Sequence, residues 1–205
     1  MPEAEVVVID DGSSDNTARV AESLDTTLIR LVVNLGVGGA MQAGYLYALR
    51  SSFDVAVQID ADGQHDASEA WRVVAPVIAG EADIAVGSRW LGRGNYKGPL
   101  NRRVGMRLLA FLVSRKVHTD VTDTTSGFRA CGKKAIALFA QRYPPEFPEA
   151  EAIVIAYSRG LKVIEVPVAM RERTQGMSSI LGIRTIYYML RVGLGLFFDT
   201  RHGGI

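Results

Sequence analysis

The sequence is poor in cysteine, in aromatic side chains and in uninterrupted apolar runs. Its 205 residues include one cysteine, Cys131, so no disulfide can form within the chain. Aromatic residues make up 8% of it, and the formal net charge is only +1. Glu3 and Glu5 stand where a secretory signal would be basic. These features exclude a disulfide scaffold and fit a reducing compartment, which predicts a cytoplasmic location.

The small net charge conceals two halves of opposite sign. Residues 1–100 hold 7 Lys/Arg and 14 Asp/Glu, whereas residues 101–205 hold 16 and 8. An acidic half suits a divalent cation, and a basic half suits phosphates or an anionic membrane surface. Two solvated faces would give the same counts, so the charge alone leaves both interpretations open.

Short apolar runs alternate with helical patterns, which predicts an α/β fold with a largely parallel sheet. The predicted strands are 6–9, 28–33, 54–59, 83–87 and 162–170. The first predicted helix follows the turn 11–16 and ends at about Leu24, with Ser13 or Ser14 as its N-cap. The other predicted helices are 38–50, 67–79, 99–116 and 149–159. Residues 118–131 are polar and are expected to be irregular.

The last predicted helix is a separate carboxyl-terminal element. The apolar stretch 180–198 contains Arg184 and Arg191, which are costly inside a bilayer and lie on one helix face. We therefore expect a main domain over 1–179, followed over 180–205 by a packing helix or one that lies at a membrane surface.

Paired carboxylates follow the predicted strand 54–59. Asp60 and Asp62 are two residues apart, so the alternation of side chains along a strand predicts that they point the same way, at the edge where ligands bind to open α/β sheets. With Gln64 they offer oxygen ligands suited to Mg²⁺ or Mn²⁺, although a solvated turn is the alternative. His65 is interpreted as a hydrogen-bonding neighbour of this group.

Two further polar segments follow the first two predicted strands. Asp10 and Asp11 can accept hydrogen bonds from a nucleobase edge, or simply form a turn. Asn34, Gly36 and the glycines after them approach a dinucleotide fingerprint, but the sixth position counted from Gly36 is Met41. NAD-dependent chemistry is therefore not expected.

The basic half carries candidate phosphate ligands. Asp123 is a candidate general base in a polar loop, with Ser126 and Arg129 beside it, unless this loop is only an ordering network. Arginine and serine suit phosphate oxygens. Such residues recur at Arg89 and, around Gly176, at Arg171, Arg173, Ser178 and Ser179, although arginines of this kind can also simply lie on the surface.

Taken together, the motifs resemble family 2 glycosyltransferases, in particular the polyprenyl-phosphate (dolichyl-phosphate) mannosyl- or glucosyltransferase branch. The matching segments, in the family's order, are 8–17, 34–40, 60–65, 87–89, 123–129, 165–168 and 173–179. The resemblance implies a GT-A-like fold and an inverting, metal-dependent transfer from a nucleotide sugar, either UDP- or GDP-linked, to a polyprenyl phosphate. It implies no nucleic-acid partner.

The resemblance also implies roles for individual residues. Donor binding falls to Asp10, Asp11, Asn34, Gly36 and Arg89. Binding of Mg²⁺ or Mn²⁺ falls to Asp60, Asp62 and Gln64, and Asp123 is the acceptor-side base. Contacts to the acceptor or its phosphate fall to Ser126, Arg129, Arg173, Ser178 and Ser179.

The chain departs from the family pattern at its start. Met1 falls after the point where the family has a first strand ending in a Pro-x-Tyr-Asn-Glu-like segment. We therefore expect an amino-terminally shortened sheet with an exposed edge at 6–9, open to pairing with a second copy. Two alternatives stay open: a non-catalytic module that binds nucleotide sugars or acts as a scaffold, and a transferase with a saccharide acceptor.

Overall fold

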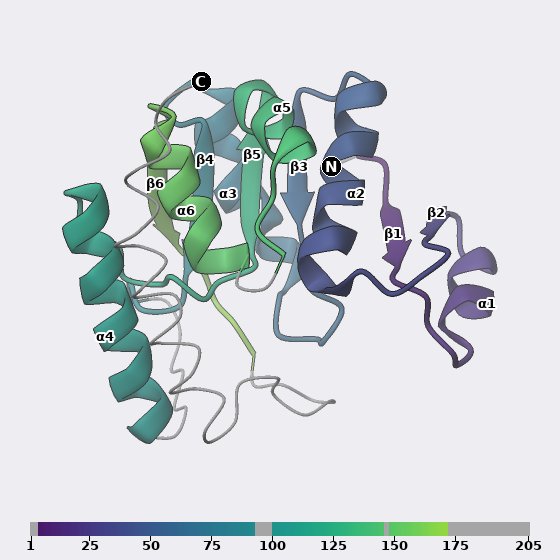
Figure 1. Ribbon diagram of the computed structural model, residues 1–205, viewed down its shortest axis with the longest axis horizontal. Coiled ribbons are helices and arrows are strands. Elements are labelled where there is room, and N and C mark those ends of the chain that lie inside the picture. Colours follow the sequence, from purple (N-terminus) through teal and green to yellow (C-terminus); the bar gives the residue numbers. More distant parts are fainter. Residues whose placement is uncertain (1–3, 93–99, 146–147, 172–205) are drawn as a thin grey trace.

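The structure is a computed structural model that describes residues 4–92, 100–145 and 148–171. Its strands are β1 (Val7–Asp10), β2 (Thr27–Arg30), β3 (Val55–Gln58), β4 (Ile84–Ser88), β5 (Arg129–Gly132) and β6 (Val163–Pro167). Its helices are α1 (Thr17–Glu22), α2 (Gly36–Arg50), the 3₁₀ turn η1 (Ala67–Glu69), α3 (Ala70–Ile78), α4 (Leu100–Val117), α5 (Lys133–Gln141) and α6 (Pro148–Ser158). The predicted α/β class is confirmed (Figure 1).

Within the described ranges, the strands form two sheets. β1 and β2 pair in parallel, and the larger sheet has the order β3-β5-β4-β6. β3, β4 and β6 run in one direction, whereas β5 lies antiparallel between β3 and β4. Because β5 is reversed, the loop that leads into it reaches the edge where β3 and β4 end.

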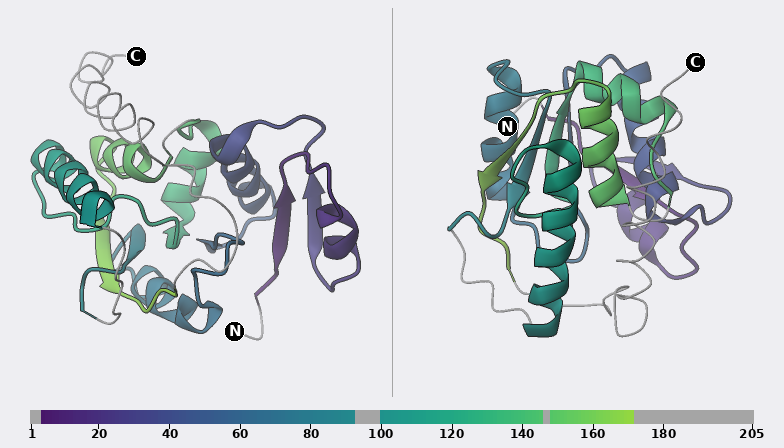
Figure 2. Two further views of the ribbon diagram at one scale, coloured as in Figure 1. Left: turned by 90° about the horizontal axis from the view of Figure 1, so that it is seen from below. Right: turned by 60° about the vertical axis from the view of Figure 1, so that its left-hand side comes forward.

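Helices cover both faces of the larger sheet. α3 packs on β3, β4, β5 and β6 from one side, while α2, α5 and α6 lie on the other (Figures 1 and 2). Every residue of β4 and β5 is buried as a result, as expected for strands covered on both faces. The strands β1, β2 and β3 are mostly only half-buried.

The hydrophobic core follows these layers. Between the sheet and α2, α5 and α6, the rings of Tyr45, Phe139 and Tyr143 pack with centroids 5.1–5.3 Å apart. On the opposite face, Phe128 and the valines of α3 fill the space beneath the sheet. A third cluster joins α4 to α6. The polar edge of the larger sheet therefore rests on a rigid, dry interior.

Several predictions of local structure were wrong. β5 overlaps residues 118–131, which were expected to be irregular. α5 lies where no helix or strand was expected. Neither Ser13 nor Ser14 caps α1, which begins after Asn16, while the Asp15 carboxylate accepts the Thr17 N–H at 2.9 Å. β3 ends at Gln58, so the alternation of side chains along a strand does not extend to the carboxylates that follow.

One part of the prediction cannot be compared with the structure. The helix expected at 180–198 and the boundary at 179 lie outside the described residues. Among the helices that are described, none combines the length and the apolar character needed to cross a bilayer.

Candidate active site at the carboxyl edge of the sheet

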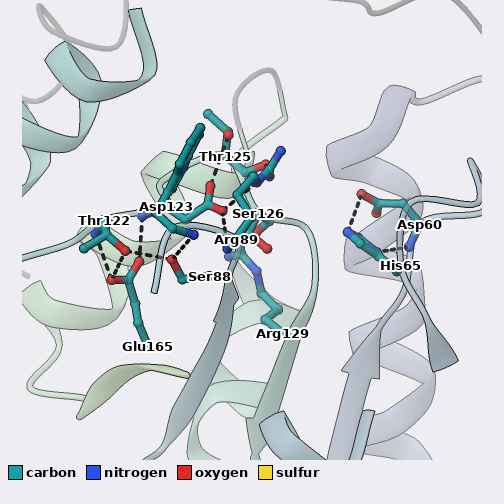
Figure 3. Close-up of polar contacts among 11 residues, drawn as sticks. Asp60, His65, Ser88, Arg89, Thr122, Asp123, Thr125, Ser126, Arg129 and Glu165 are labelled. Carbon is teal, nitrogen blue, oxygen red and sulfur yellow. Dashed lines mark hydrogen bonds and ion pairs between the residues drawn. The ribbon is translucent and has the colours of Figure 1, made fainter. Parts of the chain in front are cut away.

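The turn after β3 holds the paired carboxylates. Asp60 donates its backbone N–H to His65 Nδ1 at 3.0 Å, and its carboxylate lies 3.9 Å from His65 Nε2 (Figure 3). Asp62 Oδ1 accepts the N–H of Gln64 at 2.9 Å, which closes the turn. His65 thus acts as a hydrogen-bonding neighbour, as predicted, and its ring stacks on Phe128 at 5.0 Å.

Asp60 lies directly against the loop that leads into β5. A Cβ atom placed on Gly127 would overlap both carboxylate oxygens of Asp60. A larger residue at this position would require the Asp60 carboxylate to move away from the loop. The acidic turn after β3 and the loop that begins at Asp123 consequently belong to one site.

The charges that shift the pKa of His65 also indicate that the turn after β3 and the Arg89–Asp123 region form one site. Burial lowers the pKa of His65, and the carboxylates of Asp60 and Asp62 oppose that shift. Arg89 lowers this pKa further, whereas Asp123 raises it. Charged groups from both sides of the sheet edge thus act on one imidazole.

A buried ion pair joins the end of β4 to the loop before β5. Arg89 Nε lies 2.6 Å from Asp123 Oδ2, and the Arg89 backbone N–H donates to the same oxygen at 3.1 Å. The side chains are 5% and 0% exposed, so the pair is almost completely removed from water. The guanidinium also donates to the Thr125 carbonyl at 3.3 Å.

Glu165 holds this loop from β6, a role that sequence reasoning missed. Its carboxylate accepts the backbone N–H groups of Thr122 and Asp123 at 2.8 and 2.7 Å, and the Thr122 hydroxyl at 2.8 Å (Figure 3). Glu165 occurs in the segment 165–168 that matches the family pattern, but its partners lie 42 and 43 residues away in the sequence. No local signal could pair them.

Arg129 occupies a different environment from the one expected. It is 1% exposed, and its Nη2 donates to the carbonyls of Ser126 and Glu149 at 2.7 and 3.3 Å. The prediction that Arg129 contacts a phosphate therefore does not fit this geometry, because its guanidinium orders the loop from inside. The alternative of a loop-ordering network describes this residue.

Three buried polar atoms of the same loop have no hydrogen-bond partner within the described residues. They are Thr124 Oγ1, Ser126 Oγ and Arg129 Nε. Buried polar groups are normally paired with protein, water or a ligand. The loop thus has spare hydrogen-bonding capacity next to the Asp123–Arg89 pair, and Ser126 keeps its place as a candidate ligand.

The predicted donor residues lie after β1 and β2. Asp10 Oδ1 accepts the Ser13 N–H at 2.9 Å, and Ser13 holds the pKa of Asp10 below its usual range, the hydroxyl more than the N–H. Asp11 accepts the Leu35 N–H through its carboxylate and the Asn34 amide through its carbonyl, at 2.7 and 2.9 Å. Turn formation, the alternative noted from sequence, is thus their role in this structure.

Glycines permit these contacts. Gly12 has φ +72°, and an added Cβ would lie 3.3 Å from the Asn34 backbone nitrogen. Gly36, with φ +76°, begins α2 and donates its N–H to Asn34 Oδ1 at 3.2 Å. The remaining predicted phosphate ligands, Arg173, Ser178 and Ser179, lie outside the described residues.

The residues after β3 suit a divalent cation by their chemistry. Asp60, Asp62 and Gln64 carry oxygen donors, as Mg²⁺ and Mn²⁺ prefer. Within the described ranges, no group of three or more His, Cys, Asp or Glu side chains is assembled for a metal. At this turn the chain offers two carboxylates and an amide oxygen as possible cation ligands.

Comparison with known proteins finds glycosyltransferases. Residues 1–139 match the model of Glycosyl transferase family 2. The UDP-N-acetylglucosamine–dolichyl-phosphate N-acetylglucosaminyltransferase of Methanococcus voltae is 29% identical, over 95% of this chain and 87% of that protein. The polyprenol monophosphomannose synthase of Mycolicibacterium smegmatis is 31% identical, over 93% and 76%.

A solved structure shows the same fold. Glucosyl-3-phosphoglycerate synthase of Mycobacterium tuberculosis, crystallised with phosphoglyceric acid, superimposes with a TM-score of 0.69 at 22% identity. The match covers 93% of this chain and 69% of that one. The same enzyme has been solved with Mn²⁺ and UDP-glucose.

Proposed function

Because the chain belongs to glycosyl transferase family 2 and has a GT-A-like fold, we propose that it transfers a sugar from a UDP- or GDP-sugar to a polyprenyl phosphate. The observation that carries this proposal is the contact between Asp60 and Gly127. It joins a turn rich in cation ligands to the loop that contains the Arg89–Asp123 pair. Relatives named for transfer to dolichyl phosphate or for polyprenol monophosphomannose synthesis support the acceptor.

In the donor half of the proposed site, Asp10, Asp11, Asn34 and Gly36 shape the pocket for the nucleoside. Asp60, Asp62 and Gln64 would hold Mg²⁺ or Mn²⁺ against the diphosphate. Such a cation, when bound, supplies Lewis-acid stabilisation of the charge that develops on the leaving diphosphate. A structural neighbour that binds Mn²⁺ together with UDP-glucose supports this assignment.

In the acceptor half, Ser126 binds phosphate oxygens and Asp123 orients the acceptor. Arg89, which the sequence assigned to the donor, is proposed to bind the acceptor phosphate instead, because it pairs with Asp123. Arg89 already lies in a low-dielectric environment, where its charge acts strongly on an anion. The acceptor phosphate would share Arg89 with Asp123. Arg129 holds the backbone of Ser126 from beneath and has no direct contact with the phosphate in this scheme.

The proposed reaction is a single displacement with inversion. An oxygen of the acceptor phosphate attacks the anomeric carbon as the bond from that carbon to the diphosphate oxygen breaks. The electron pair of the broken bond leaves with the nucleoside diphosphate. Since a phosphate monoester is already anionic at neutral pH, Asp123 positions the nucleophile and has little deprotonation to perform.

The exposed face of α4 fits an acceptor that resides in a membrane. Val104, Leu108 and Phe111 are 61%, 50% and 57% exposed, and their spacing places them along one side of the helix. α4 contains five Arg or Lys residues and no acidic residue. Apolar and basic side chains together suit an anionic membrane surface, so we propose peripheral attachment through α4.

The dimer expected through residues 6–9 stays a proposal. β1 pairs only with β2 among the described residues, and Val6 at its start is 58% exposed. This open edge offers backbone groups to a second copy. Light scattering across a concentration series would show a dimer or a monomer.

A transfer assay tests the function directly. Radiolabelled UDP- and GDP-sugars, Mn²⁺ and polyprenyl phosphate are incubated with the chain, with the Asp62→Ala variant and with Asp25→Ala, an exposed carboxylate away from the turn. We expect labelled lipid from the chain and from Asp25→Ala, and at least a ~100-fold loss for Asp62→Ala.

Three results would contradict the proposal in different ways. Transfer by Asp62→Ala equal to that of the unmodified protein would reject the cation site. Transfer to a saccharide in the absence of lipid phosphate would mean that the acceptor is a saccharide and not a polyprenyl phosphate. Tight nucleotide-sugar binding without transfer to any acceptor would indicate the non-catalytic alternative.

A further inference from the structure

The carboxylate of Glu165 ends a directed chain of hydrogen bonds. An ionised carboxylate only accepts, so the Thr122 hydroxyl donates to Glu165 at 2.8 Å. Thr122 therefore accepts from the Ser88 hydroxyl at 2.7 Å, and Ser88 in turn accepts the Trp90 N–H at 3.2 Å. The direction of each bond follows from the charge at the end of the chain.

This series of hydrogen bonds holds the residues on both sides of the Arg89–Asp123 pair. Glu165 fixes the backbone of Asp123 through a direct bond at 2.7 Å. Through Thr122 and Ser88 it also fixes the residues on either side of Arg89. One carboxylate on β6 thus orders the end of β4 and the loop before β5.

We propose that Glu165 is a positioning residue for the transfer reaction, acting through Asp123 and Arg89. The inference rests on the function proposed above. Hydrogen bonds from backbone N–H groups to a charged acceptor are among the stronger ones in proteins. Catalytic geometry is sensitive at this scale, since a displacement of about 1 Å can cost ~100-fold in rate.

The structure offers an isosteric test and a matched control. In Glu165→Gln, the amide presents one accepting oxygen and one NH₂ group, so at least one backbone N–H faces a donor and loses its bond. The control is Asp83→Asn. Asp83 also accepts a backbone N–H, that of Lys162 at 2.8 Å, but at the opposite end of β4 and β6.

The first readout is steady-state kinetics with both substrates varied. For Glu165→Gln we expect kcat to fall by about 10- to 100-fold, while KM for the nucleotide sugar stays within about twofold. For Asp83→Asn we expect kcat to stay within about twofold. Equal losses of kcat in the two variants, or a rise in donor KM with unchanged kcat, would overturn the proposal.

The second readout does not depend on activity. Amide hydrogen exchange measured by NMR should show faster exchange at Thr122 and Asp123 in Glu165→Gln and unchanged exchange there in Asp83→Asn. Unchanged protection at both amides in Glu165→Gln would also overturn the proposal. If the unmodified chain transfers no sugar, the proposed function fails, and the exchange data still report whether Glu165 holds Asp123.

A second variant guards against misfolding of the first. Thr122→Val keeps both backbone N–H groups on Glu165 but removes the hydroxyl bonds to Glu165 and Ser88. We expect its kcat to fall less than that of Glu165→Gln, by about 3- to 10-fold. A kcat equal to that of the unmodified protein would contradict the role of these hydrogen bonds.

Discussion

The proposed donor half and the proposed acceptor half of the site contain similar polar residues but differ in how they are held. After β1 and β2, the candidate donor residues Asp11, Asn34 and Gly36 are exposed or half-buried, whereas Asp10 is 2% exposed; Val32 beside them is 99% exposed. At the ends of β4 and β5, Arg89, Asp123 and Arg129 are at most 5% exposed. The acceptor half is thus part of the core, whereas most of the donor half, apart from Asp10 and Gln64, lies nearer the surface.

Because of this difference, we expect effects on folding stability and effects on ligand binding to fall at different residues. A substitution in the acceptor half removes packing or leaves a buried charge without its partner, so it should affect folding and function together. A substitution at an exposed position of the donor half should affect ligand binding with little change in folding. The predictions below test this contrast.

The largest expected effect follows removal of Arg89. Arg89→Ala leaves the Asp123 carboxylate buried without its ion-pair partner, which we expect to cost about 3–5 kcal/mol in the free energy of unfolding. Urea denaturation measures this cost, and transfer activity should be lost as well. A change below about 1 kcal/mol, as for an exposed pair, would place Asp123 in water and contradict the structure.

The same substitution in each half provides a matched pair of intermediate size. Val86 in β4 is 0% exposed, whereas Val32 is 99% exposed. We expect Val86→Ala to cost about 1.5–3 kcal/mol and Val32→Ala less than about 0.5 kcal/mol. Similar costs at the two positions, measured by urea denaturation, would mean that Val32 is covered in solution.

The smallest expected changes are in the free energy of unfolding, and they have opposite signs in the two halves. The pKa of Asp10 is lowered, so its carboxylate stabilises the fold at neutral pH, and this contribution is lost as pH falls through that pKa. Burial raises the pKa of Glu149, so stability falls as pH rises from the usual carboxyl range through the raised pKa. Asp10→Asn should therefore be destabilising, and Glu149→Gln stabilising, at neutral pH.

Both differences from the unmodified chain should vanish in acid, where all the carboxyls are protonated. Unfolding free energies from urea titrations across the acid-to-neutral range measure them. Differences of the same sign at neutral pH would remove the electrostatic contrast between the halves.

The sequence predicted what depends on local pattern. An apolar run followed by Asp60 and Asp62 was enough to place the acidic turn after a strand. β5 was missed because Arg129–Gly132 is short and includes alanine and glycine, which are uncommon in strands, and because its pairing with β3 and β4 is long-range.

Long-range contacts also explain the errors in the site. Arg129 was assigned to a phosphate because it belongs to a segment that matches the family motif and because arginine suits phosphate oxygens, yet Ser126 and Glu149 supply carbonyls that accept from it inside the fold. Glu165 had no assigned role because its partners come from a loop far away in the sequence. Burial and partners of this kind depend on topology, which a single sequence does not reveal.

The central claim is that a divalent cation binds at the turn after β3, next to the loop of Asp123. Crystals grown with Mn²⁺ and UDP or GDP, with data collected at the manganese absorption edge, test it most directly. The account predicts an anomalous peak within coordination distance of Asp60 or Asp62, with the nucleotide diphosphate beside it. Bound nucleotide with no peak at this turn, or with a peak at other residues, would contradict it.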